Sequence, residues 1–270
     1  MISTVDPQLG DHVCLPFDTD DALQAHVGEF TAAGLTAGDR VMVFTQSVSV
    51  DAMTGWLRYH RPGFASALDG GQLQVHSPGA VHLAGGHFDA ERMMAGFAHA
   101  TDQAEADGYP GLRVTVDMSW ALQRVPGVEQ LFDFEAVANR LFIDRRLAAV
   151  CAYDRRRFSR AAIQRACAAH PITPGMSMLR FARPARPGLR LSGEVDMTNR
   201  HALRGLLAAL ADDDLTLDLT GITFIDGRGA GLIAHHAATS AGHTTLRCTP
   251  ATARLLRLLD VDQAATIAAG

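Results

Sequence analysis

The feature that most constrains this chain is the regular alternation of short apolar runs with segments of helical periodicity. The first apolar run is Arg40–Thr45 (RVMVFT), and a helical pattern follows it at residues 50–59. Alternation of this kind is typical of a parallel sheet covered by helices on both faces, because each parallel crossover needs a helix. Later strands are predicted at 72–76, 112–118 and 148–153, and later helices at 89–106, 128–142 and 159–169.

A linker is predicted at Arg183–Gly188, where two prolines and a glycine interrupt any helix or central strand. It separates a larger domain, residues 8–182, from a smaller α/β domain, residues 187–268. The smaller domain has strands at 189–193, 215–219 and 244–248, and helices at 199–211, 229–240 and 251–259. A chain of 270 residues with 47% hydrophobic residues has enough material for two such cores.

The composition limits the expected cellular location and the expected classes of partner. The net charge of −5 argues against nucleic acid as a partner, because such binding depends on neutralising phosphates. No run of 18 apolar residues is present, and Met1–Pro7 has no signal-peptide character, so we expect a cytoplasmic protein with no membrane partner. Four scattered cysteines indicate reduced thiols. Abundant alanine and a complete lack of lysine suggest a GC-rich, actinobacterial genome.

The smaller domain carries a recognisable motif at residues 217–233, LDLTGITFIDGRGAGLI. This stretch resembles the signature of STAS domains, the fold of bacterial anti-sigma-factor antagonists. The resemblance implies that Asp226, Gly227, Arg228 and Gly229 face a partner, an anti-sigma factor or related signalling protein. The family's phosphoacceptor serine corresponds here to Gly227, so the usual covalent switch is missing. Thr220 and Thr223 lie nearby as alternative acceptors of little weight.

The larger domain resembles another family, the MEDS sensory domain of methanogen and methylotroph regulators that respond to small halocarbons. The matching stretches are Gly10–Cys14, Gly34–Val41, Val116–Trp120, Phe134-Glu135, Cys151–Arg155 and His170-Pro171. The resemblance implies a regulator that senses a small ligand, not an enzyme. Whether the protein is a homodimer is left open.

The stretch 30–45 also resembles the entry to a RecA-type or circadian-clock ATPase, which implies a RecA/KaiC-like sheet. Asp117 would occupy the place of a Walker-B carboxylate. A phosphate-binding loop needs glycines and a lysine, however, and the loop after residue 45 has no glycine. We therefore expect phosphate chemistry to be lost, although a residual nucleotide hydrolase stays as an alternative.

A ligand pocket is expected at the carboxyl ends of the parallel strands, where open α/β sheets bind their ligands. We expect a small apolar or amphipathic ligand there. Trp120 would form a wall of this pocket or, alternatively, cap the core. The candidate ligand-binding residues, including those in the MEDS-like stretches, are His12, Cys14, Thr45, Gln46, Asp117, Trp120, Glu135, Cys151 and Tyr153.

His12 and Cys14 point to the same face of an extended segment and are the candidates for a metal site. A zinc site needs about two more ligands, for which Cys151, His76 and His87 are available. The alternatives are a buried thiol beside a hydrogen-bonded histidine, which we favour, a metal or haem sensor, and a thiol hydrolase using a Cys–His pair. We expect no metal and no cofactor.

Overall fold

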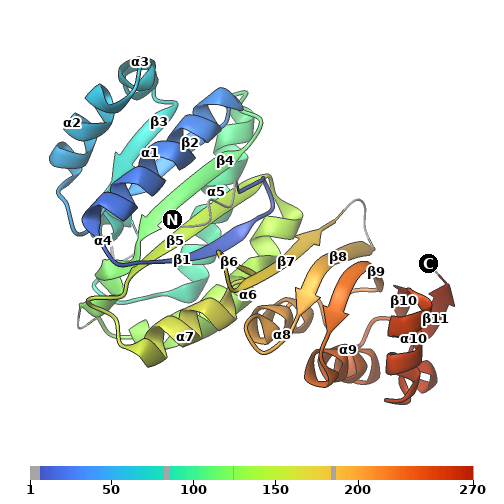
Figure 1. Ribbon diagram of the computed structural model, residues 1–270. Coiled ribbons are helices and arrows are strands. Elements are labelled where there is room, and N and C mark those ends of the chain that lie inside the picture. The colour runs from blue at the N-terminus through green and yellow to red at the C-terminus, as the bar shows by residue number, and fades with distance from the viewer. Residues whose placement is uncertain (1–6, 82–84, 124, 184–186, 270) are drawn as a thin grey trace. The chain divides into compact units, whose positions relative to one another are not determined.

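The computed structural model describes residues 7–81, 85–123, 125–183 and 187–269 (Figure 1). Its contacts divide the chain into two compact units, each described here by itself. The first comprises Met1–Leu131 and Arg145–Gln164, and the second comprises Phe132–Asp144 and Arg165–Gly270. The domain limits 8–182 and 187–268 stay a prediction, and residues 184–186 of the proposed linker lie outside the described residues.

The first unit is built on a fully parallel sheet with the strand order β1-β5-β4-β2-β3. Every residue of β4 and β5 is buried, as expected for central strands that are covered on both faces. The strands are β1 (His12–Phe17), β2 (Arg40–Phe44), β3 (Leu73–His76), β4 (Leu112–Asp117) and β5 (Leu147–Asp154).

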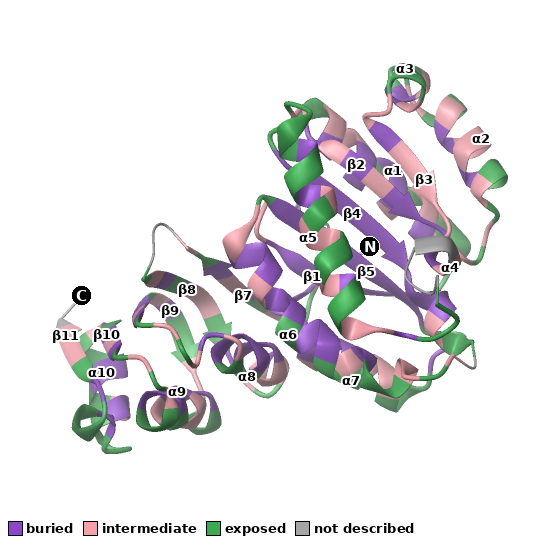
Figure 2. Cartoon of the chain, turned by 180° about the vertical axis from the view of Figure 1, so that it is seen from behind, coloured by how far each residue is buried: buried purple, intermediate pink, exposed green. Residues whose placement is uncertain are grey.

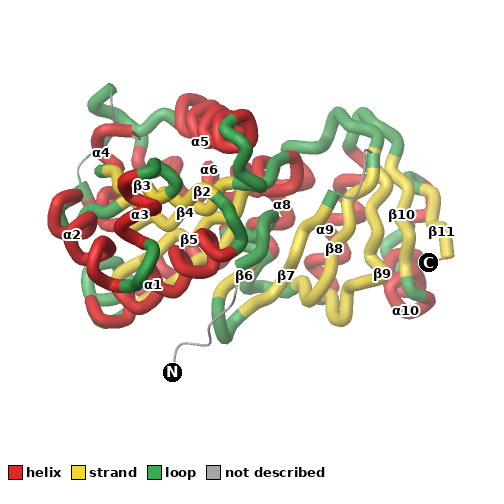
Figure 3. Tube along the Cα trace, turned by 90° about the horizontal axis from the view of Figure 1, so that it is seen from above, coloured by secondary structure: helices red, strands yellow, loops and turns green. Residues whose placement is uncertain are grey.

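Helices cover both faces of this sheet. Figure 3 shows α1, α2 and α3 on one side and α5 on the other. Side chains just before the helices fix where they begin: Thr19, Ser49 and Asp89 each accept a hydrogen bond from a backbone amide of the first turn. The helices are α1 (Asp20–Thr36), α2 (Val50–His60), α3 (Phe64–Asp69), α4 (Pro78–Val81) and α5 (Ala90–Ala106), and the 3₁₀ turns are η1 (Met118–Leu122) and η2 (Val128–Gln130).

The architecture confirms the expected α/β class with a parallel sheet between layers of helices. Strands predicted at 40–45, 72–76, 112–118 and 148–153 correspond to β2, β3, β4 and β5. The structure adds β1, α1 and α3, which the apolar pattern did not reveal. No helix of the described residues is both long enough and apolar enough to cross a membrane.

The second unit has a mixed sheet with the order β11-β10-β9-β8-β7-β6, in which β8 to β11 are parallel and β7 is antiparallel to its neighbours. Buried leucines of β8, α8 and β9 form its core, which is coloured purple in Figure 2. Its elements are α6 (Leu131–Asp144), β6 (Ile172–Thr173), β7 (Ser177–Ala182), β8 (Gly188–Val195), α8 (Arg200–Ala208), β9 (Leu215–Ile225), α9 (Gly227–Thr239), β10 (Thr244–Cys248), α10 (Pro250–Arg257), η3 (Val261–Gln263) and β11 (Thr266–Ala269), and α7 (Arg160–Ala169) follows β5.

Close backbone packing holds α6 in this unit. A Cβ atom added to Gly205 of α8 would come within 2.5 Å of the Ala136 backbone, so only glycine fits at this crossing. Asn139 is fully buried, and its amide donates to the carbonyl oxygens of Ala136 and Ala169 at 2.9 and 3.1 Å. This side chain therefore fixes the end of α7 beside the middle of α6.

A buried ion pair ties two segments of the first unit together. Arg113 in β4 donates from Nε to a carboxylate oxygen of Asp39 at 2.7 Å, and from Nη1 to the carbonyl oxygen of Pro7 at 2.7 Å. Both charged side chains are almost completely buried. Because each charge has lost its water, each depends on the other for compensation.

We predict that Asp39→Ala lowers the free energy of unfolding by about 3–5 kcal/mol, because it leaves the Arg113 guanidinium buried without its counter-charge. Urea unfolding followed by circular dichroism measures this. The control is Asp69→Ala, which removes the exposed Arg58–Asp69 pair and should change stability within experimental error. Equal effects of the two substitutions would contradict the prediction.

Candidate functional site

The carboxyl end of β4 is organised by Asp117. Its carboxylate accepts hydrogen bonds from the backbone amides of Ser47 at 2.7 Å, Gln46 at 3.3 Å and Ser119 at 2.9 Å. The residue that was compared with a Walker-B carboxylate thus anchors the loop after β2 to the start of η1. This hydrogen bonding gives Asp117 a structural task that needs neither magnesium nor nucleotide.

The other residues predicted at this edge lie close to the core. Thr45 donates its hydroxyl to the carbonyl oxygen of Val48 at 2.8 Å. Trp120 is 1% exposed and stacks on Phe88, with ring centroids 5.9 Å apart, and Tyr153 is fully buried. The structure brings Thr45, Gln46 and Asp117 together, whereas Trp120 takes the core-capping position. A ligand pocket at this edge stays a prediction.

The first strand–helix turn of the sheet differs from a phosphate-binding loop. Only Asp18 and Thr19 connect β1 to α1, and the Thr19 hydroxyl already accepts from the amide of Ala22 at 3.1 Å. A phosphate-binding loop needs a longer, glycine-rich turn followed by lysine. The sequence has no glycine between β1 and α1 and no lysine at any position.

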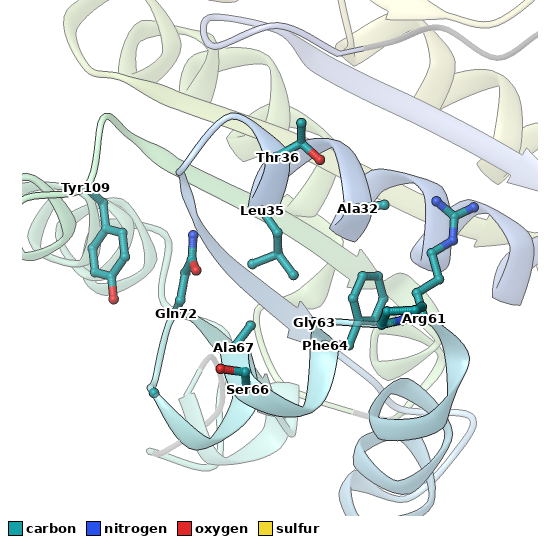
Figure 4. Close-up of a pocket in the computed structure, with 12 residues that line it drawn as sticks. Ala32, Leu35, Thr36, Arg61, Gly63, Phe64, Ser66, Ala67, Gln72 and Tyr109 are labelled. Atoms are coloured by element: carbon teal, nitrogen blue, oxygen red, sulfur yellow. The ribbon is translucent and has the colours of Figure 1, made fainter.

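A cavity of about 630 Å³ lies near the opposite, amino-terminal ends of β2, β3 and β4. Figure 4 shows Leu35, Phe64, Gln72 and Tyr109 arranged around it. Apolar residues such as Leu35 and Phe64 and polar residues such as Gln72 line it together, so it suits a small amphipathic molecule. None of its residues was predicted from the sequence. The lining residues are Ala32, Leu35, Thr36, Arg61, Pro62, Gly63, Phe64, Ser66, Ala67, Gly70, Gln72 and Tyr109.

Three of the lining residues contact neighbouring groups. Arg61 forms an ion pair with Glu29, and the amide of Gln72 donates to the carbonyl oxygen of Asp39 at 3.0 Å. The ring of Tyr109 packs against the guanidinium of Arg40, 4.5 Å from its centroid. These contacts position the three side chains at the cavity.

Parallel pairing of β1 with β5 determines the neighbours of His12. His12 and Cys151 are both buried, and Nε2 of His12 lies 3.6 Å from Sγ of Cys151. Cys14 is the register partner of Cys151 in the adjacent strand. The histidine therefore contacts the cysteine of the neighbouring strand, a relation that spacing along one strand does not reveal. Burial of both groups argues against the nucleophilic Cys–His pair considered above.

Glu135 and His170 form a second buried pair, on α6 and immediately after α7. Oε2 of Glu135 lies 3.7 Å from Nε2 of His170, and the two residues are 3% and 0% exposed. Nδ1 of His170 lies 2.7 Å from the carbonyl oxygen of Ala166. Since a carbonyl only accepts hydrogen bonds, Nδ1 carries the proton of this contact.

The two buried pairs belong to different units, His12 and Cys151 to the first and Glu135 and His170 to the second. His12, Cys151 and Glu135 were predicted as ligand-binding, and His170 was noted only within a MEDS-like stretch. In the first unit, the sulfur that His12 contacts belongs to the cysteine on the next strand and not to Cys14.

In the second unit, Asp226 caps the start of α9. Its carboxylate accepts from the amide of Gly229 at 2.6 Å, while Gly227 and Arg228 are exposed. A Cβ atom on Gly227 would meet nothing within 4 Å, whereas one on Gly229 would press against Val195. The predicted partner-binding residues therefore form an open helix N-terminus, which favours negatively charged groups.

Two exposed apolar side chains lie near this helix end in the chain and were not predicted. Met197 follows β8 and is 72% exposed, and Phe224 near the end of β9 is 51% exposed. Strand pairing places Glu194 beside Phe224 and Val195 beside Ile225, so both come from the same edge of the sheet as Asp226. Contiguous exposed apolar patches mark contact surfaces, so these two residues are candidates for one.

The two threonines near the motif have hydroxyls that are already engaged. Thr220 donates to Asp218 at 2.6 Å, and Thr223 donates to the carbonyl oxygen of Gly193 at 3.0 Å. Burial favours a raised pKa for the Asp218 carboxyl, but hydrogen bonds from Thr220 and Arg190 outweigh it, and the pKa is lowered. Phosphorylation of Thr220 would place a second anion beside this carboxylate.

Comparison with known families gives two matches in order along the chain. The model described as MEDS, "MEthanogen/methylotroph, DcmR Sensory domain", matches residues 11–171, and the model described as "Mlab, STAS domain" matches residues 180–268. Comparison with curated protein sequences gives no match. Among solved structures, the flagellar accessory protein FlaH from Methanocaldococcus jannaschii is similar with a TM-score of 0.44 and 9% identity, over 72% of this chain and 81% of that one.

We predict that Asp117→Ala lowers the free energy of unfolding by about 2–3 kcal/mol, because three backbone amides lose a charged acceptor. Chemical denaturation provides the measurement. Asp18→Ala is the control, since Asp18 follows β1 of the same sheet and makes an exposed ion pair with Arg155. Unchanged stability together with a loss of ATP binding would contradict the structural role.

Proposed function

Because the chain belongs to the family defined by the MEDS sensory domain, we propose that it is a cytoplasmic signalling protein that couples ligand sensing to binding of a protein partner. The observation that carries the proposal is the order of the two matched domains, a sensory domain followed by a STAS domain. Both domain types support a signalling or regulatory role. We propose that the protein acts by binding and is not an enzyme.

The ligand in this proposal is a small apolar or amphipathic molecule. Two locations are supported: the carboxyl edge of the parallel sheet beside Asp117, and the recess lined by Leu35, Phe64 and Tyr109. The second has the stronger support, because it is a cavity of about 630 Å³ lined by apolar and polar residues. At the first location, the Asp117 carboxylate is engaged by backbone amides and Trp120 is buried.

The partner in this proposal is an anti-sigma factor or a related signalling protein. It would dock at the start of α9, where Arg228 offers positive charge and Met197 and Phe224 offer apolar contact area. The N-terminus of a helix attracts acidic side chains through its free amides. Because Gly227 occupies the acceptor position, phosphorylation at that position does not control this domain in the proposal. Control would come from the ligand, which shifts the equilibrium between two conformations of the protein by binding one of them more tightly than the other.

We predict that Met197→Asp weakens binding to a cognate anti-sigma factor by about tenfold or more, because a charge would be buried in an apolar contact. Calorimetry with purified candidate anti-sigma factors from the source organism measures the affinity. Leu258→Asp is the matched control, because Leu258 is similarly exposed at 76% but follows α10. Equal weakening by both variants, or by neither, would contradict the proposed surface.

We also predict that Gly227→Ser creates an acceptor for the partner kinase. The added side chain meets no atom within 4 Å, so the helix start should be undisturbed. Phosphate mapped by mass spectrometry after incubation with the kinase should appear on the variant at this position and be absent from the parent. Gly231→Ser, which also has open space around its Cβ, is the control and should stay unmodified.

Phosphorylation of the parent chain on Thr220 or Thr223 that weakens partner binding would contradict control by ligand alone. Such phosphorylation would show that a threonine hydroxyl can leave its hydrogen bond to Asp218 or Gly193 and react with the kinase. Arg228→Ala tests the charge at the start of α9. The affinity of this variant for the partner should fall if the partner presents an acidic face.

A further inference from the structure

The recess of about 630 Å³ lined by Leu35, Phe64 and Tyr109 contains a single formal charge. Among the twelve described residues that line it, Arg61 is the one charged side chain, and none of the twelve is an aspartate or a glutamate. All twelve belong to the first unit, so the recess is complete without the second. A ligand that uses the available charge must therefore carry a negative group.

Arg61 lies between this recess and a neighbouring one of about 490 Å³. Ala32, Thr36 and Arg61 line both, whereas Glu29, the ion-pair partner of Arg61, lines the neighbouring one. The pair is open to solvent, because the side chains of Arg61 and Glu29 are 39% and 63% exposed. Exposed pairs contribute little to stability, so a carboxylate inside the recess can replace Glu29 at small cost.

Apolar side chains extend from Arg61 across the recess. Figure 4 shows Arg61 near one end and Tyr109 near the other, with Leu35 and Ala67 between them in this view. All four residues line the same cavity. A ligand with its charged group at Arg61 would therefore lay its body against apolar surface, which is the usual division of roles in a small-molecule site.

Two other guanidinium groups near the recess already have counter-charges within the protein. Arg40, which packs on the ring of Tyr109, pairs with Asp107 at 2.8 Å. Arg113, which lines the neighbouring recess, pairs with Asp39 at 2.7 Å and is buried. These pairs leave Arg61, whose partner is exposed, as the guanidinium best able to accept a new anion.

The C-terminal end of α1 beside the recess presents little negative charge to such an anion. Free carbonyl oxygens at a helix end would repel it. Three of the last four carbonyls of α1 are instead bonded by the amides that follow the helix. These bonds join Ala37 to Ala33 at 3.0 Å, Asp39 to Gly34 at 2.9 Å and Gly38 to Leu35 at 3.1 Å.

We propose that the recess binds a small monocarboxylic acid, with its carboxylate on the guanidinium of Arg61 and its aromatic or aliphatic body against Leu35 and Phe64. A guanidinium favours a carboxylate because its planar donors can form two parallel hydrogen bonds with it. One arginine matches one negative charge, whereas a phosphate group carries more charge and three strong acceptor oxygens. The inference rests on the proposed sensing function and names the class of its ligand.

Calorimetric titration of the full-length chain with phenylacetate and with its neutral amide, phenylacetamide, tests the charge of the ligand. The acid should bind more tightly than the amide, and its affinity should fall as salt is added. Arg61→Gln should weaken binding of the acid about tenfold and leave the amide unchanged. Arg58→Gln is the matched control, because Arg58 makes a similar exposed pair with Asp69 and is not one of the lining residues.

Glu29→Gln gives a gain of binding, which a folding defect cannot produce. The substitution frees Arg61 from its internal carboxylate, so the acid should bind severalfold more tightly while the affinity for the amide stays the same. Ser66→Trp adds a large side chain at an exposed position of α3 that lines the recess. This variant should lose binding of both compounds.

The outcomes separate the ligand class from the location of the site. If acid and amide bind equally, are lost together in Ser66→Trp and do not respond to Arg61→Gln, the carboxylate assignment is wrong and the recess remains the sensing site. If neither compound binds the unaltered chain, the assignment fails together with the recess as the ligand site. Acid binding that persists in folded Ser66→Trp would also overturn the proposal, because the acid would then bind elsewhere.

Discussion

The cost of burying charged and polar side chains governs the details of this structure. A parallel sheet covered on both faces offers little contact with water, so each polar side chain inside it needs a partner of the right kind. Asp39 is compensated by Arg113, and Asp117 by backbone amides of two loops. In the second unit, the buried carboxylate of Glu135 lies 3.7 Å from the ring of His170.

The same requirement determines what the residues compared with ATPase motifs do in this structure. Asp117 ends a buried strand, as a magnesium-binding carboxylate would, and its oxygens accept hydrogen bonds from Gln46, Ser47 and Ser119. The turn after β1 is short, and Thr19 in this turn caps α1. Loss of phosphate chemistry stays a prediction from the sequence.

The fold class was predictable from the sequence because strands buried on both faces give continuous apolar runs such as those of β2, β4 and β5. The strand β1 was missed because Pro16 interrupts its run, and proline lacks the amide that a central strand normally uses. The helix α1 has apolar residues spread around its axis and shows little periodicity. Its signals lay instead in Thr19 and the two acidic residues of its first turn.

Part of the site could also be predicted. The sequence indicated that His12 lies in an extended segment, and the structure places it in β1. The register between β1 and β5, which brings Cys151 beside His12, cannot be read from spacing along the chain. Glu135 was indicated only through the resemblance to the sensory family, whereas Cys151 was also considered as a further metal ligand beside His12 and Cys14. The cavity near Leu35 and Tyr109 gave no sequence signal, because its walls come from a helix end, a turn and strand starts.

The central claim is that a buried charge in this sheet is tolerated because a partner compensates it. A double-mutant cycle on Asp39 and Arg113, followed by urea unfolding, tests this most directly, because the cycle isolates the energy of the pair. The account predicts that Asp39→Ala and Arg113→Met together cost clearly less stability than the sum of the two single substitutions. Losses that simply add would contradict it.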